Sequence, residues 1–497
     1  MSNQMRFAAS VAVLLLAAAV VWIALYDRFR RPAPRMYLPV VRPTALDAWE
    51  PTAPERADAE PPGPPCEDLP QKWMVFCWDG ADWDIVLPLL EDGKLPHLSQ
   101  LMQKGAYGNL YTIQPSLSPV LWTSVATGVS PRRHGILAFA KPRTRIQKIV
   151  NTTRQLYSNA DRNVRALWNL LSEHGRQVMM VGYHNTYPAE EVEGLMVSSY
   201  LVHQHMVRTL QKRTEVEEGF SRGLIHPYEF LKEVLSMQRP MEDATPEELA
   251  RFAIMEPQES DVPPSKDAAC GEATRREFLR RAYLYDTFHA DVARRFLPRI
   301  EPDVMALHFQ GMDWAAHYFL FFHEPEPSAL LNWPKDVSNA LSGERRKHRN
   351  TVKAFYEYAD EWLGRFLELR DPGTGVLVLS DHGFEPEHNC ERTGYHDEAP
   401  PGIVVIEGPG VRRGERLSSA TIYDILPTLM ASLGLPVARD LDGRVLHEAF
   451  CSDALPPDSI AYVDTYEKGE RYVPHAALPP VVDEEIQKQL ESLGYLN

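Results

Sequence analysis

Short apolar runs alternate with longer segments of helical periodicity along most of the chain after residue 72. The apolar runs predict strands that are buried on both faces, and they comprise Trp73–Cys77, Val178–Gly182, Val304–His308, Val376–Ser380 and Ile403–Ile406. Segments with apolar residues every three or four positions, such as Val164–His174 and Lys353–Arg370, predict helices between those strands. This alternation predicts an α/β fold in which helices sandwich a mostly parallel central sheet.

The first apolar segment of the chain has a different character. Phe7–Tyr26 contains no charged residue and reaches the length of about 20 residues that a helix needs to cross a bilayer. It includes Trp22 and ends in Tyr26, aromatic residues suited to a membrane interface, and no small-residue cleavage motif follows it. We therefore expect residues 1–32 to form a single-pass membrane anchor rather than a cleaved signal peptide.

The charges beside this segment bear on its orientation. Arg6 precedes it, whereas Arg28, Arg30 and Arg31 follow it. Under the positive-inside rule, this excess on the C-terminal side favours a cytoplasmic location for the rest of the chain.

Three further segments depart from the α/β pattern. Residues 33–70 are rich in Pro, Ala and Glu and predict an extended linker. Residues 201–282 are polar and punctuated by Pro, and they predict a helical cap inserted into a catalytic domain of residues 71–470. Residues 471–497 form a tail in which Asp483–Tyr495 predicts a short amphipathic helix.

Composition narrows the class of protein. The chain has 497 residues, of which 44% are hydrophobic, enough for a buried core. Its 52 Lys and Arg against 68 Asp and Glu give a formal charge of −16, which argues against a nucleic-acid-binding protein. The 5 cysteines are scattered and lack CxxC spacing, so they predict neither a disulfide framework nor a thiolate zinc site.

Ionisable side chains lie beside the predicted strands at the edge where open α/β sheets bind ligands. They are Asp79 after the first strand, Asp313 and His317 after the third, Asp381 and His382 after the fourth, and His396 before the fifth. Each motif alone is compatible with a solvated helix face or a turn cap. Because loops at the ends of parallel strands converge, the set together predicts a metal site. Mixed carboxylate and imidazole ligands suit Zn²⁺ or Mn²⁺ better than Ca²⁺ or Mg²⁺.

The segment Pro115–Gly128 (PSLSPVLWTSVATG) is the second candidate feature. Ser118 followed by Pro119 predicts a helix with Ser118 as its N-cap, and Gly128 predicts its end. A capped helix is the simplest interpretation. The positive end of a helix dipole beside a metal ion also favours a serine alkoxide and an approaching phosphate, which makes Ser118 the candidate nucleophile. Thr123 falls inside the helix, where a hydroxyl bonds back to a carbonyl.

Taken together, these motifs resemble the alkaline phosphatase superfamily, in its type I phosphodiesterase/nucleotide pyrophosphatase branch. The resemblance covers about residues 73–446 and rests, in this order, on WDGAD, SLSPVLWTSVATGVSPRRHGI, D-x-x-x-H at Asp313 and His317, SDHG, and the segment His396–Ile403. It implies an alkaline-phosphatase-like fold and a metal-dependent hydrolase of phosphate esters. It also implies two divalent metal ions, zinc or alternatively manganese.

The resemblance assigns roles to individual residues. One metal ion would be held by Asp79, Asp381 and His382 and would contact Ser118, and the other would be held by Asp313, His317 and His396. The family's nucleophile lies nine residues before the Thr of a Thr-Gly pair, which here is Thr127, and this spacing also selects Ser118. The implied reaction passes through a phosphoseryl intermediate. Relatives with an N-terminal anchor usually act outside the cytoplasm, so the resemblance favours an extracytoplasmic catalytic domain against the Arg count.

One departure from the family concerns the phosphate contact. The nucleotide pyrophosphatases carry an Asn shortly after the His-Gly-Ile segment, and it helps to bind a phosphoryl oxygen. Phe139 stands in that place here, and Pro119 offers no backbone N–H to a phosphate. Lys141 and Arg143 are nearby cations that are candidates for this contact or, equally, for a solvated surface role, whereas His134 is expected to be structural.

Other functions fit parts of the pattern. The sulfatase branch requires a C/S-x-P-x-R context that the nucleophile segment lacks, and the cofactor-independent phosphoglycerate mutases share the core but not an anchor. A membrane-anchored phosphotransferase resembling the phosphoethanolamine transferases is the main alternative. A non-catalytic, metal-stabilised binding domain is a weaker one, because the candidate ligands and nucleophile are all present.

Overall fold

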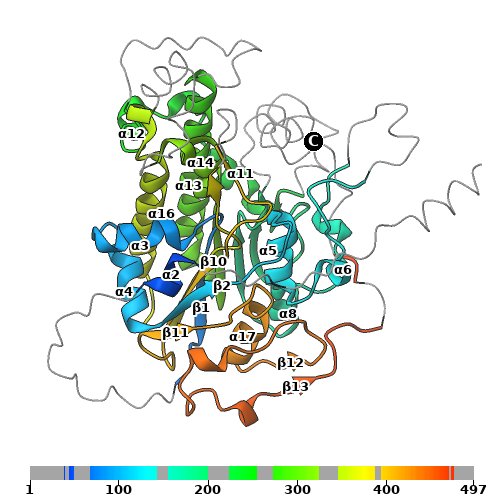
Figure 1. The fold of residues 1–497 in the computed structure, drawn as a ribbon. Coiled ribbons are helices and arrows are strands. Elements are labelled where there is room, and N and C mark those ends of the chain that lie inside the picture. The colour runs from blue at the N-terminus through cyan, green and yellow to red at the C-terminus, as the bar shows by residue number, and fades with distance from the viewer. Residues whose placement is uncertain are drawn as a thin grey trace, which may run out of the picture. The chain divides into compact units, whose positions relative to one another are not determined.

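The computed structural model describes residues 39, 44–49, 68–142, 155–199, 223–254, 272–323, 345–386, 393–469 and 472–474. These residues contain a nine-stranded sheet of order β11-β2-β10-β7-β1-β6-β3-β4-β5, which runs through the centre of the domain (Figure 1). Its strands are β1 (Lys72–Trp78), β2 (Ala106–Leu110), β3 (Val178–Val181), β4 (Gly194–Val197), β5 (Ile225–His226), β6 (Val304–Phe309), β7 (Thr374–Leu379), β10 (Gly402–Glu407) and β11 (Glu415–Leu417). Two-stranded pairs form between β8 (Glu385–Pro386) and β9 (Gly394–Tyr395), and between β12 (Val437–Ala438) and β13 (Tyr462–Val463).

The centre of the sheet is parallel, as the sequence predicts. Strands β7, β1, β6, β3 and β4 pair in parallel, and every residue of β6 and β7 is buried. Each predicted strand is present with its ends shifted by no more than a few residues. The fold class is therefore confirmed as α/β with a mostly parallel central sheet.

Strand β10 runs antiparallel to both of its neighbours, β7 and β2. Its direction has a consequence for the site. The start of an antiparallel strand lies at the same edge of the sheet as the ends of its neighbours. The loop before β10, which carries His396, is therefore brought to the edge where β1, β6 and β7 end.

Helices cover both faces of this sheet. The helices α3, α4 and α16 lie together on one side, and α5, α8 and α17 lie on the other (Figure 1). The bounds are α3 (Trp83–Glu91), α4 (Pro96–Lys104), α5 (Ser118–Thr127), α6 (Pro131–His134), α8 (Leu167–Glu173), α13 (Glu272–Ile300), α14 (Gly311–Phe319), α16 (Thr351–Leu367) and α17 (Ile425–Ser432). Helices α8 and α16 correspond to the two segments of predicted helical periodicity.

The described part of the expected insertion, residues 223–254 and 272–282, contains more than helices. Strand β5 adds to the edge of the sheet beside β4, and the short helices α11 (Leu231–Ser236) and α12 (Pro246–Leu249) follow it. The long helix α13 begins within the insertion and continues beyond it to pack on β3 and β6. The expected boundary at residue 282 therefore falls inside a single helix.

Part of the segment expected to be an extended linker is folded. Residues Ala45–Ala48 form the helix α2, with Leu46 fully buried. The Thr44 hydroxyl donates to Asn109 Oδ1 at 2.8 Å, and the ring of Trp49 packs edge-on against that of Tyr107 at 6.4 Å. Leu46 and Trp49 supply the apolar surface that allows this short segment to dock despite its Pro-rich surroundings.

Two predictions concern segments near the ends of the chain. The expected anchor at Phe7–Tyr26 and tail helix at Asp483–Tyr495 lie outside the described residues. Within the described ranges, none of the helices combines the length and apolar character that crossing a bilayer requires.

The cysteines differ from expectation at one position. Cys451 is disulfide-bonded, whereas Cys77 is a free and buried thiol. Spacing along the chain did not predict this bond, because a single disulfide depends on which segments meet in space.

Candidate metal centre

The predicted metal-ligating residues meet at one edge of the sheet. Asp79 directly follows β1, Asp381 and His382 follow β7, and Asp313 and His317 lie on α14, which follows β6. His396 comes from the loop between β9 and β10. All of these side chains, and Ser118, are buried.

The first group consists of Asp79, Asp381 and His382, whose nearest ligand atoms all lie within 4.8 Å of one another. His382 Nε2 is 3.5 Å from Asp79 Oδ1 and 3.6 Å from Asp381 Oδ2. The Ser118 hydroxyl lies 3.5 Å from both Asp79 Oδ1 and His382 Nε2. This is the set that the resemblance assigned to one metal ion and to the nucleophile.

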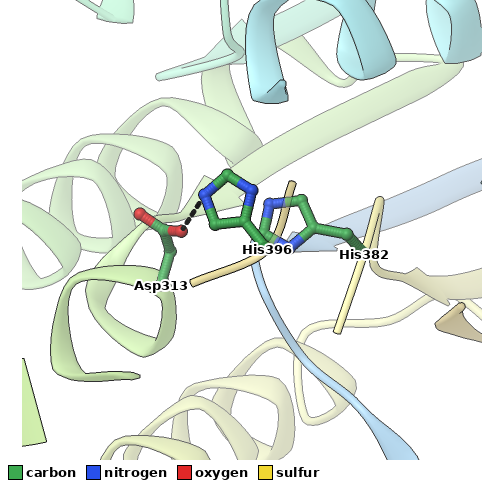
Figure 2. A group of neighbouring side chains, drawn as sticks. All are labelled: Asp313, His382 and His396. Atoms are coloured by element: carbon green, nitrogen blue, oxygen red, sulfur yellow. Dashed lines mark ion pairs between the residues drawn. The ribbon is translucent and has the colours of Figure 1, made fainter. Parts of the chain in front are cut away.

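The second group consists of Asp313, His382 and His396 (Figure 2), again with ligand atoms within 4.8 Å. His396 Nε2 lies 3.9 Å from Asp313 Oδ1, and His317 Nε2 lies 3.5 Å from the same oxygen. The rings of His382 and His396 stack at 4.0 Å between centroids. The structure therefore places His317 against Asp313 as expected, and it adds His382, which lies between the two groups.

Hydrogen bonds to backbone carbonyls orient the three histidines alike. The Nδ1 atoms of His317, His382 and His396 lie 2.9, 2.9 and 2.6 Å from the carbonyl oxygens of Gly394, Gly383 and Ser116. A proton on Nδ1 serves these bonds and leaves the Nε2 lone pair directed at the carboxylates. This is the arrangement found for imidazoles that ligate metal ions.

The carboxylates of Asp313 and Asp381 are buried and incompletely hydrogen-bonded. Neither oxygen of Asp381, nor Oδ1 of Asp313, has a hydrogen-bond partner among the described residues. Burial, and then the charges of Asp79 and Asp313, raises the pKa of Asp381 well above its usual value. Buried carboxylates are stable only when paired or bound to a cation, so these residues fit divalent metal ions.

Ser118 differs from expectation in one local detail. Helix α5 starts at Ser118 with Leu117 as its N-cap, and the serine hydroxyl makes no capping bond. The hydroxyl instead faces Asp79 and His382. Gly128 ends the helix in the left-handed conformation, with φ 63°, as predicted. The Thr123 hydroxyl bonds back to the Pro119 carbonyl at 2.6 Å and is not directed at the site by that bond.

The polar residues near the expected phosphate contact have other partners. Lys141 Nζ pairs with Asp161 at 2.5 Å, and Arg143 lies outside the described residues. His134 is buried and its Nε2 lies 3.0 Å from the Ser124 hydroxyl, which agrees with a structural role. Phe139, in the place of the family's Asn, packs against the ring of His184 at 6.2 Å.

Two residues that hold Asp79 were missed from the sequence. The Trp122 indole donates to Asp79 Oδ2 at 2.8 Å, and His308 Nε2 lies 3.3 Å from the same oxygen. Burial raises the pKa of Asp79, but the hydrogen bond from His308 and the charges of His382, His308 and His184 outweigh it and lower the pKa to about 2. The available signals were the spacing of Trp122 from Ser118 and the place of His308 at the end of a strand.

The family of the chain follows from its sequence over most of the folded part. Residues 74–424 match the family described as type I phosphodiesterase / nucleotide pyrophosphatase. The chain belongs to this family. The branch predicted from the motifs is therefore confirmed.

Individual relatives are more distant. A 2,3-bisphosphoglycerate-independent phosphoglycerate mutase of Cereibacter sphaeroides is 34% identical over 99 residues, which make up 19% of either chain, so the match spans about a fifth of that relative. The human ectonucleotide pyrophosphatase / phosphodiesterase 5 has a TM-score of 0.43 at 10% identity, covering 78% of this chain and 99% of that one. A phosphonate monoester hydrolase of Silicibacter pomeroyi has a TM-score of 0.44 at 14% identity, covering 78% of each chain.

Proposed function

We propose that the chain is a metal-dependent hydrolase of phosphate esters with Ser118 as its nucleophile. One observation carries the proposal. The Ser118 hydroxyl lies 3.5 Å from two side chains of a buried ligand group, and that group adjoins a second one through His382. A hydroxyl against such a group is suited to attack on phosphorus, and membership of the phosphodiesterase family supports the same reaction.

The proposed ligands form two sets, one for each metal ion. Asp79, Asp381 and His382 would hold one divalent ion, zinc or manganese, and Asp313, His317 and His396 would hold the other. Two such ions supply Lewis-acid stabilisation for both the attacking and the departing oxygen of an in-line displacement.

Ser118 performs the covalent chemistry. Its Oγ forms a bond to phosphorus while the bond from phosphorus to the ester oxygen breaks, and the serine proton leaves with the departing alcohol. Water then cleaves the bond between Oγ and phosphorus, which restores the serine and releases the phosphorylated product. Asp79 and His382 orient the hydroxyl before the attack.

The start of helix α5 favours negative charge without donating to it directly. Pro119 has no N–H, and the amides of Val120 and Leu121 both donate to the Leu117 carbonyl, at 2.8 and 3.0 Å. The helix therefore contributes its dipole to the site rather than a row of free donors. Orientation of the phosphate depends on the metal-ligand groups.

The test uses the full-length protein in detergent. Hydrolysis of p-nitrophenyl phosphate, bis-p-nitrophenyl phosphate and p-nitrophenyl phosphocholine is measured with metal analysis of the same sample. We expect activity that EDTA removes, that zinc or manganese restores, and that Ser118→Ala lacks. Ser124→Ala is the matched control, because that hydroxyl lies on the same helix but bonds back to the Val120 carbonyl at 2.9 Å. Full turnover by Ser118→Ala would disprove the nucleophile.

A phosphotransferase differs from a hydrolase only in the acceptor that removes the phosphoryl group from Ser118. Product analysis in the presence of an added alcohol separates the two. Free phosphate or phosphomonoester as the sole product supports hydrolysis. A fraction of phosphorylated alcohol among the products that exceeds the mole fraction of the alcohol in the solvent supports transfer.

A further inference from the structure

The two oxygens of Asp79 face different surroundings. Oδ1 lies 3.5 Å from the Ser118 hydroxyl and 3.5 Å from His382 Nε2, so it faces the proposed metal ion. Oδ2 accepts the indole N–H of Trp122 at 2.8 Å and lies 3.3 Å from His308 Nε2. The second oxygen is thus occupied by the protein itself, and one oxygen is left for a metal ion.

The groups on Oδ2 are held in place by packing. Trp122 comes from α5 and His308 from β6, and both side chains are buried. Their rings meet edge to face at 5.0 Å between centroids. The ring of Tyr183 packs on that of Trp122 at 5.7 Å, and the Tyr183 hydroxyl donates to the Trp122 carbonyl at 2.8 Å.

Trp122 is also connected to the nucleophile through its helix. It lies four residues after Ser118 in α5, and side chains four apart share one face of a helix. The helix that carries the proposed nucleophile therefore also carries a donor that fixes a proposed metal ligand. A shift of α5 would move both together.

We propose that Trp122 and His308 are positioning residues that hold Asp79 as a one-oxygen metal ligand and lock the nucleophile helix to the metal centre. The inference rests on the proposed function for the identity of the site. Hydrogen bonds to a ligating side chain from residues behind it commonly change metal affinity or activity by about 10- to 100-fold. We expect an effect of that size on zinc affinity when the Trp122 indole N–H, or the His308 imidazole beside Oδ2, is removed.

The experiment measures zinc affinity of the full-length protein in detergent by competition with a chromophoric chelator. Trp122→Phe removes the indole N–H and keeps an aromatic ring. His308→Leu removes the imidazole that lies beside Oδ2, whereas His308→Gln places an amide N–H near the position of Nε2. Trp168→Phe is the matched control, because the Trp168 indole also donates to a buried carboxylate, Glu190 Oε1 at 2.6 Å, outside the metal centre.

The expected result is a 10- to 100-fold loss of zinc affinity in Trp122→Phe and His308→Leu, partial recovery in His308→Gln, and wild-type affinity in Trp168→Phe. Circular dichroism checks that each variant is folded, and if His308→Leu is not, Trp122→Phe decides. Wild-type affinity in Trp122→Phe, or an equal loss in Trp168→Phe, would overturn the inference.

Turnover separates this inference from the proposed function. A wild-type protein that binds zinc but hydrolyses no phosphate ester, with the affinity losses as expected, would overturn the function and support the positioning role. A wild-type protein that hydrolyses esters, with unchanged zinc affinity in Trp122→Phe and His308→Leu, would support the proposed function and overturn the positioning role. A wild-type protein that binds no zinc or manganese would overturn both.

Discussion

Asp381 shows at the scale of one residue how the site depends on a cation. Its carboxylate is buried, has no hydrogen-bond partner among the described residues, and is adjacent to Asp79 and Asp313. An unpartnered buried polar group costs about 1–3 kcal/mol, and more when it is charged. The metal-free protein therefore contains a local instability that metal binding removes.

Replacing Asp381 should separate stability from metal binding. Asp381→Asn removes the buried charge, so we expect the metal-free variant to be more stable than the metal-free wild type by about 1–3 kcal/mol. With zinc added, the wild type should gain stability and the variant should gain little. Chemical denaturation of both proteins, with EDTA and with zinc, measures the four values.

Asp371→Asn is the control for this substitution. Its carboxylate is exposed and pairs with Lys72 at 3.6 Å, so the change should alter stability little under either condition. A metal-free Asp381→Asn protein that is less stable than the wild type would show that this carboxylate has a partner inside the metal-free protein.

The sequence revealed the proposed ligands and not the residues that orient them. Asp79, Asp313, Asp381 and the histidines stand out because polar residues at the ends of apolar strands need an explanation. Trp122 lies among apolar residues of α5 and is typical of a core position. Its hydrogen bond to Asp79 exists only because β1 and α5 meet in the fold, and spacing along the chain does not specify that contact.

At the scale of elements, Asp360 joins two helices on the same side of the sheet. It lies in α16, and its carboxylate accepts the amide N–H groups of Leu98 at 2.7 Å and of His97 at 3.1 Å, in the first turn of α4. Burial raises the pKa of Asp360 from 3.8 to about 6, although these two hydrogen bonds lower it.

This shift predicts a dependence of stability on pH. The folded protein binds the Asp360 proton more tightly than the unfolded chain, so this group's contribution decreases as the pH rises from about 4 to about 6 and is constant above that. Asn does not titrate, so Asp360→Asn should gain roughly 2 kcal/mol relative to the wild type over this interval, out of about 3 kcal/mol across the complete titration of the group in both states. Chemical denaturation of both proteins between pH 4 and pH 7 measures the difference.

Glu368→Gln, at the exposed end of the same helix, is the control and should track the wild type across this range. A constant difference in the free energy of unfolding between Asp360→Asn and the wild type would contradict the shift.

The short helix α2 is a second element whose contribution can be measured. Leu46 is its buried residue, and Thr44 and Trp49 attach its ends to Asn109 and Tyr107. Truncating a buried Leu commonly costs about 2–5 kcal/mol. Because α2 has only four residues and Leu46 is its buried residue, we expect Leu46→Ala to increase hydrogen exchange in residues 44–49 more than it lowers global stability.

Hydrogen exchange with mass spectrometry checks this expectation, with Ala48→Ser, at an exposed position of the same helix, as the control. Equal exchange of residues 44–49 in Leu46→Ala and the wild type would mean that α2 does not depend on Leu46. If α2 contributes as expected, a domain that starts at β1 lacks part of its own packing.

Elements with a repeating pattern of apolar residues could be predicted from the sequence. The direction of a strand and the docking of a short helix could not. The buried strands β1, β3, β6, β7 and β10 follow from their apolar runs. The antiparallel direction of β10 does not, because a strand buried on both faces has the same pattern in either direction. Helix α2 was missed because two apolar residues in a Pro-rich segment carry little periodic signal.

At the scale of the whole molecule, we propose that the catalytic domain lies outside the cytoplasm. Cys451 is disulfide-bonded, and disulfides persist in oxidising compartments and are rare in the cytosol. This supports the location of anchored relatives against the excess of Arg after Phe7–Tyr26. Under this orientation, the phosphate-ester substrate is one that is met outside the cytoplasm.

The proposed location can be tested through the cysteines of the native protein. The protein is purified from the cells that express it without reductant, denatured, treated with an alkylating reagent and digested for mass spectrometry. We expect the Cys451 peptide to be unmodified and linked to a second cysteine peptide, and the Cys77 peptide, buried in the folded protein, to be alkylated once the chain is unfolded. Alkaline phosphatase fused after Asn497 should be active, because that reporter folds only when exported. A Cys451 peptide that is fully alkylated without reduction, together with an inactive fusion, would place the domain in the cytoplasm.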